Sequence, residues 1–135
     1  MKRSLLLLGL AVASLLLIAG CSSPPSESNE VADLVHVVII SSPETIQLGQ
    51  PVQIEAHVTQ GSKPVEDAQE VEIEIWKEGN NKHEKIKVAH DRGGIYPISR
   101  TFSEEGVYYV IAHVTARDMH VMPKKELVVG AVKSK

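Results

Sequence analysis

The stretch Glu70–Trp76 reads Glu-Val-Glu-Ile-Glu-Ile-Trp, with apolar side chains at every second position up to Ile75. Side chains of a β-strand point alternately to its two faces, so this pattern predicts a strand with one buried and one exposed face. Val71, Ile73 and Ile75 would face a hydrophobic core. The three glutamates would form a solvated sheet surface, and Trp76 on the same face would serve as packing or cover.

Six further segments, separated by turn residues, repeat strand-like patterns along the chain. They are Leu34–Ile40, Val52–Val58, Ile86–Val88, Ile95–Phe102, Val107–Thr115 and Glu126–Val132. Seven short strands with turn signals roughly every 8–12 residues, and no helical periodicity, are typical of a two-sheet sandwich. We therefore expect an all-β, immunoglobulin-like β-sandwich of about seven strands.

Two residues refine this expectation. Pro97 cannot donate a backbone hydrogen bond, which favours an edge position or a bulge for its strand. Tyr108 follows the turn at Gly106 and enters the penultimate strand, which is the position of a tyrosine corner in sandwiches of this kind. In that topology the penultimate strand pairs with the third strand and with the last.

The N-terminal segment has the parts of a signal peptide. Lys2 and Arg3 are positively charged, Leu5–Leu17 is apolar, and Ile18–Cys21 reads Ile-Ala-Gly-Cys. The apolar run is too short for an ordinary membrane span. Its ending resembles the lipobox of bacterial lipoproteins, which implies that Cys21 becomes the lipidated first residue of the mature chain. The alternative is a secretory signal that leaves Cys21 as a free thiol.

These features divide the chain into four expected parts. Residues 1–20 would be the signal peptide, 21–33 the lipidated cysteine with a flexible Ser/Pro-rich tether, 34–132 the sandwich domain and 133–135 a short tail. The lipid would hold the domain on the outer face of the cell membrane. Because Cys21 is the single cysteine, the domain would depend on packing and not on a disulfide for its stability.

Composition and motifs argue against two classes of function. The 17 acidic residues outnumber the 14 lysines and arginines, and no basic patch with interleaved aromatic residues occurs, so we do not expect a nucleic-acid partner. No glycine-rich phosphate loop precedes a helix, and no Ser-His-Asp order stands in a strand-turn-helix context. We therefore do not expect an enzyme.

The segment His113–Lys125 holds two of the three methionines of the protein, and it suggests a metal site. Thioether and imidazole groups form a soft, thiol-free ligand set that suits Cu(I) outside the cytoplasm, where thiolates oxidise. His120 and Met122 would project to one side of an extended segment, whereas Met119 would join them only if the loop curled. The candidate copper ligands are His113, Met119, His120 and Met122, with His83 and His90 as secondary candidates. His36 and His57 would lie on the opposite sheet.

Three segments together resemble a known family. They are Gly61–Ala68 with the pattern G-x-x-P-V-x-x-A, Gly93–Tyr96 with Phe102–Tyr108 in the pattern G-x-Y then F-x-x-x-G-x-Y, and His113–Pro123. The set resembles the YtkA-like family, small envelope domains related to the periplasmic portion of FixH proteins, over Val35–Val132. The resemblance implies an immunoglobulin-like sandwich, membrane attachment and, for some members, a link to copper supply for cytochrome oxidase assembly.

Together these observations predict a membrane-anchored, extracytoplasmic copper-binding protein. It would hold copper in the loop between the last two strands and pass it to a cytochrome oxidase subunit or another assembly factor. The alternative is a metal-free, immunoglobulin-like interaction module of a membrane protein complex. In that case the histidine-methionine segment would be a contact surface, a role for which the adaptable methionine side chain is suited.

Overall fold

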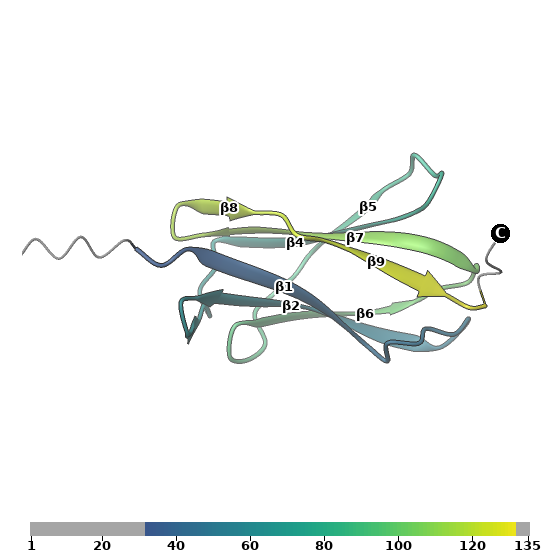
Figure 1. Ribbon diagram of the computed structural model, residues 1–135, viewed down its shortest axis with the longest axis horizontal. Coiled ribbons are helices and arrows are strands. Elements are labelled where there is room, and N and C mark those ends of the chain that lie inside the picture. The colour runs from purple at the N-terminus through teal and green to yellow at the C-terminus, as the bar shows by residue number, and fades with distance from the viewer. Residues whose placement is uncertain (1–31, 132–135) are drawn as a thin grey trace, which may run out of the picture. The chain divides into compact units, whose positions relative to one another are not determined.

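The computed structural model describes residues 32–131, which form nine β-strands and no helix (Figure 1). Within this part of the chain there is accordingly no helix long and apolar enough to cross a membrane. The strands form two antiparallel sheets that pack face to face, as expected for a sandwich. The predicted signal peptide, Cys21, most of the tether and the C-terminal tail lie outside the described residues.

The first sheet has four strands. β2 (Pro51–Gln60) pairs with β1 (Val35–Ser42) along one edge, and with β3 (Lys63–Pro64) and β6 (Ile95–Thr101) along the other. Among the described strands β6 pairs with β2 alone, so it is an edge strand, which is one of the two alternatives that Pro97 predicted.

The second sheet has five strands, and β7 (Gly106–Ala116) is at its centre. Along one edge β7 pairs with β4 (Glu70–Lys77), which in turn pairs with β5 (Glu84–Lys87). Along its other edge β7 pairs in succession with β8 (Met119–Val121) and β9 (Lys124–Val129). The expected pairing of the penultimate strand with the third and the last is therefore present.

The structure has two strands more than the expected seven, and its last strand is shifted. The additional strands, β3 and β8, have two and three residues, too few to produce a recognisable alternation in the sequence. The last strand also begins earlier than predicted, at Lys124, and ends at Val129. The additional strand β8 and the earlier start of β9 have one cause, which is that the histidine-methionine segment pairs with β7.

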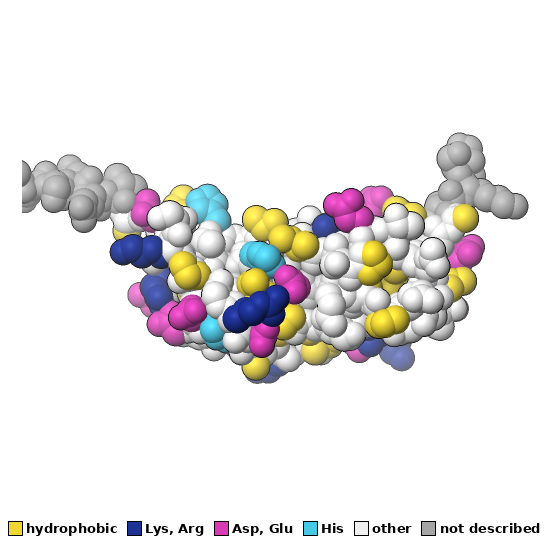
Figure 2. All heavy atoms as spheres, turned by 90° about the horizontal axis from the view of Figure 1, so that it is seen from below, with side chains coloured by type: hydrophobic (Ala, Val, Ile, Leu, Met, Phe, Trp, Pro, Cys, Tyr) yellow, Lys and Arg dark blue, Asp and Glu magenta, His cyan; other side chains and the backbone are white. Residues whose placement is uncertain are grey.

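The core lies between the sheets, and it is made of the inward-facing residues that alternation predicts. Ile54 of β2, Ile73 of β4 and Val110 of β7 are completely buried. Within residues 32–131 the buried core residues run from Val35 to Val129, so the strands of both sheets contribute to one core. The face of the domain in Figure 2 carries histidine, acidic and basic side chains, with apolar side chains in small groups among them.

Two tyrosines connect turns to the strands. The Tyr108 hydroxyl donates to the carbonyl of Glu104 at 3.0 Å, which confirms the predicted tyrosine corner. The Tyr96 hydroxyl donates to the carbonyl of Val65 at 3.0 Å and accepts from the N–H of Ala68 at 3.1 Å. Tyr96 therefore holds the segment that crosses from the first sheet to the second.

Candidate metal centre

The histidine-methionine segment is a β-hairpin and not an open loop. Arg117 and Asp118 connect β7 to β8, and both have positive φ angles, 53° and 59°. Positive φ at both central residues is the requirement of the type I′ turn, whose twist matches that of paired strands. The usual sequence signal for this turn is Asn-Gly or Asp-Gly, so the Arg-Asp sequence did not reveal the hairpin.

Met122 lies opposite His113. β8 and β9 pair with β7 in the same register. Between these two paired regions lie residues 112–113 of β7 and residues 122–123, which link β8 to β9. In this interval the N–H of Ala112 donates to the carbonyl of Pro123 at 3.1 Å, which shows that the register continues. Met122 precedes Pro123 and His113 follows Ala112, so these two residues face each other across the strands.

His113, His120 and Met122 share the outer face of the second sheet. His120 pairs with Thr115, and its Nδ1 lies 2.9 Å from the Thr115 hydroxyl. The ring centroids of His113 and His120 are 6.1 Å apart. Opposite residues on one face of an antiparallel pair have Cβ atoms about 4.5–5.5 Å apart, which brings Met122 beside His113. The structure therefore groups three of the four predicted ligands.

Met119 lies on the other face. It pairs with the buried Ala116 and packs against the hydrophobic core. Neighbouring residues of a strand point to opposite faces, so Met119 and His120 cannot meet while β8 is paired. The curled loop that Met119 would need is not present, and the structure does not bring this residue to the other three.

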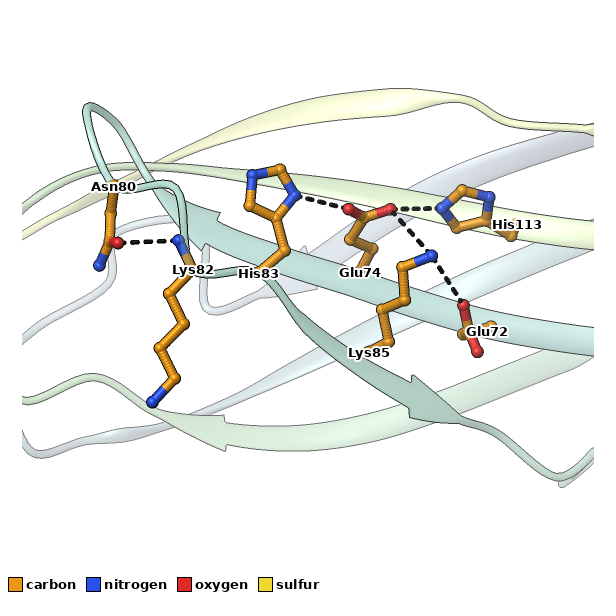
Figure 3. Close-up of polar contacts among 7 residues, drawn as sticks. All are labelled: Glu72, Glu74, Asn80, Lys82, His83, Lys85 and His113. Carbon is orange, nitrogen blue, oxygen red and sulfur yellow. Dashed lines mark hydrogen bonds and ion pairs between the residues drawn. The ribbon is translucent and has the colours of Figure 1, made fainter.

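Glu74 lies between two histidines, which sequence analysis did not foresee (Figure 3). Its Oε1 is 2.6 Å from His83 Nδ1, and its Oε2 is 2.6 Å from His113 Nε2. Lys85 Nζ is 4.0 Å from Oε2. The hydrogen bonds from His83 and His113 lower the pKa of Glu74 below its ordinary value, although burial opposes this effect.

The prediction of a solvated glutamate surface is thus wrong for Glu74, which is only 9% exposed. The same prediction is partly correct for Glu72 and correct for Glu70. Glu72 is half-buried and lies 3.6 Å from Lys85 Nζ, and Glu70 is exposed. Alternation predicts the strand face on which Glu74 lies. It does not predict that His83, in the connection after this strand, contacts Glu74.

His83 contacts two residues of β4, Glu74 and Trp76. It lies in the connection between β4 and β5, and its ring stacks on Trp76 with a centroid distance of 4.4 Å and an interplanar angle of 3°. Trp76 also contacts Tyr109, at a centroid distance of 5.5 Å. The prediction that Trp76 is a packing residue is confirmed, and its partner is the secondary candidate His83.

The remaining histidines are elsewhere. His90 Nε2 accepts a hydrogen bond from the N–H of Gly94 at 3.3 Å, and its ring packs edge-on against Tyr96. His90 thus supports the turn before β6. His36 and His57 belong to β1 and β2 of the first sheet, as predicted.

The donor set is soft. In residues 32–131 no group of three or more histidine, cysteine, aspartate or glutamate side chains is arranged to hold a metal ion. Two imidazoles and one thioether on one face are instead the ligand types that suit Cu(I).

A family model described as YtkA-like matches residues 29–113. The chain belongs to the YtkA-like family. The match covers Glu74, His83 and His113 and ends before β8, so His120 and Met122 lie beyond the matched part of this YtkA-like protein. A search of curated proteins gave no match.

Solved structures that resemble the YtkA-like domain have low sequence identity to it. An engineered protein matches with a TM-score of 0.54 and 18% identity over 73% of this chain, which spans about 20% of that protein's length. Superoxide reductase (neelaredoxin) from Ignicoccus hospitalis gives a TM-score of 0.46, 18% identity and coverage of 73% and 82% of the two chains. A CARDB domain of a Pyrococcus furiosus protein, crystallised with di-metal ions, gives a TM-score of 0.45 and 17% identity. That match covers 73% of this chain and 90% of the CARDB chain. At these identities the likeness concerns the fold alone.

Proposed function

We propose that this YtkA-like protein binds copper outside the cytoplasm and passes it to a membrane-bound acceptor. The acceptor would be a cytochrome oxidase subunit or another assembly factor. A lipid on Cys21 would keep the domain at the outer face of the membrane, within reach of such an acceptor.

The observation that supports the proposal is the common face of His113, His120 and Met122. Two imidazoles and a thioether can hold Cu(I) without a thiol that would oxidise in this compartment. The Thr115 hydroxyl contacts Nδ1 of His120 and leaves Nε2 of that ring for a metal. Met122 is 56% exposed, so an acceptor can approach and replace the ligands one at a time.

The decisive experiment is a Cu(I) competition titration of the chain Ser22–Lys135 against a chromogenic chelator. This chain contains the entire described core. Met122→Leu removes a sulfur from the outer face, and Met119→Leu removes one from the core face at similar volume, which makes them a matched pair. We expect stoichiometric binding by the parent chain and by Met119→Leu. Met122→Leu and His120→Ala should bind Cu(I) at least about tenfold more weakly, which is a loss of at least about 1.4 kcal/mol of binding free energy.

The opposite outcome is equally clear. Absence of binding above that of an unrelated sandwich domain would refute the copper function. The metal-free interaction module would then be the better description, and the exposed Val38 and Ile40 of β1, together with Met122, would be its first candidate contacts. Equal weakening in both methionine variants would mean that the ligand face is assigned incorrectly.

A further inference from the structure

Glu74 has the surroundings of a residue that orients its neighbours. The residue is 9% exposed on the outer face of β4, and each of its two carboxylate oxygens is 2.6 Å from a different imidazole nitrogen (Figure 3). An ionised carboxylate can only accept hydrogen bonds, so the contacting nitrogen of each ring must be the one that carries hydrogen. These nitrogens are Nδ1 of His83 and Nε2 of His113.

The two contacts therefore determine the tautomers. A neutral imidazole has one N–H, and its other nitrogen has a free lone pair. For His113 this free nitrogen is Nδ1, and for His83 it is Nε2. A carboxylate that holds the N–H of a metal-binding histidine fixes the ring orientation and increases the basicity of the free nitrogen.

We propose that Glu74 is a positioning residue of the copper site, a role that rests on the proposed function. It holds His113 in the tautomer whose Nδ1 binds the metal. Through its second oxygen it also fixes His83, and the stacking of His83 on Trp76 keeps that contact in place. The site thus extends from the β7–β8 hairpin to the connection between β4 and β5.

Glu72 provides a matched control. It is directly opposite His113 in the β4–β7 register and lies on the same face as Glu74. Its carboxylate, however, lies 3.6 Å from Lys85 Nζ and forms no hydrogen bond to an imidazole among the described residues. Glu72→Gln and Glu74→Gln make the same chemical change two residues apart on one strand, and only the second changes a side chain that is hydrogen-bonded to His83 and His113.

The test is to determine the histidine tautomers by long-range ¹H–¹⁵N NMR on the metal-free chain Ser22–Lys135, at about pH 8.5, well above the ordinary pKa of a histidine side chain. We expect His83 protonated at Nδ1 and His113 protonated at Nε2, in both the parent chain and Glu72→Gln. Glutamine offers one acceptor oxygen and one donor amide, so in Glu74→Gln one of the two rings should adopt the other tautomer. A parent chain with either ring in the opposite tautomer would overturn the proposal, whether or not the variant folds.

A copper titration of the same proteins separates this proposal from the function on which it rests. We expect Glu74→Gln to bind Cu(I) about 10–100-fold more weakly and Glu72→Gln to bind within about threefold of the parent chain. If the parent chain binds copper and the tautomers change while affinity does not, Glu74 is not a positioning residue. If the parent chain binds no copper, the proposed function fails, and the NMR result still decides whether Glu74 sets the two tautomers.

Discussion

Tyr96 is a single side chain on which the crossover between the sheets depends. It is 2% exposed, and its hydroxyl bridges the carbonyl of Val65 and the N–H of Ala68. Tyr96→Phe leaves both backbone groups without this partner, and we expect it to lower the free energy of unfolding by about 1–3 kcal/mol. Urea unfolding measures the change. Tyr108→Phe is the control, because the half-buried Tyr108 has one such bond and its loss should cost less.

The same hydroxyl predicts a pH dependence. Burial raises the pKa of Tyr96 above its ordinary value. The unfolded chain therefore loses this proton at about pH 10, while the folded domain still holds it. The stability that Tyr96 contributes is complete below the unfolded pKa and is lost as pH rises toward the folded pKa. The parent chain should lose more stability than Tyr96→Phe between about pH 9 and 11, and an identical loss in both would contradict the assignment.

The β7–β8 hairpin is the element that positions His120. Asp118 occupies its turn with a φ of 59°, a region that costs an L-residue roughly 1–2 kcal/mol and glycine almost nothing. We expect Asp118→Gly to leave the stability unchanged or to raise it by up to about 1 kcal/mol. Asp118→Val, which is β-branched, should lower it by about 1–2 kcal/mol. Thermal unfolding followed by circular dichroism compares the two, and equal stability would mean that the turn does not require positive φ.

At the scale of the whole molecule, the two sheets share one core. Ile73 of β4 is completely buried in the cluster that includes residues of both sheets. We expect Ile73→Ala to destabilise the domain by about 2–5 kcal/mol while keeping a single transition. Fluorescence of Trp76, the single tryptophan, reports on the second sheet, and far-UV circular dichroism reports on both. Two separated transitions would show that the sheets unfold independently.

Alternation along the strands was sufficient to predict the architecture. The inward positions of the central strands are the buried ones, including Val71, Ile73 and Ile75, because burial of one sheet face imposes a period of two on the sequence. The edge position of Pro97 and the corner at Tyr108 were predictable for the same kind of reason. Each depends on a local property, a missing donor or a turn followed by a tyrosine, that does not require knowledge of distant residues.

The ligand face was only partly predictable. Local alternation separates His120 and Met122 from Met119, and the structure has that separation. The position of His113 opposite Met122 depends on the register of β8 and β9 on β7, which is set by a two-residue turn without a recognisable sequence signal.

By itself, the sequence of this YtkA-like protein determined its class of fold and the strand face of each side chain, because these follow from the chemistry of successive residues. Only the tertiary structure decided that Glu74 meets His83 and His113. His83 is 9 positions and His113 is 39 positions along the chain from Glu74. Contacts over such separations depend on loop paths and strand pairing. A buried carboxylate requires partners, but its own segment of the chain does not specify which side chains supply them.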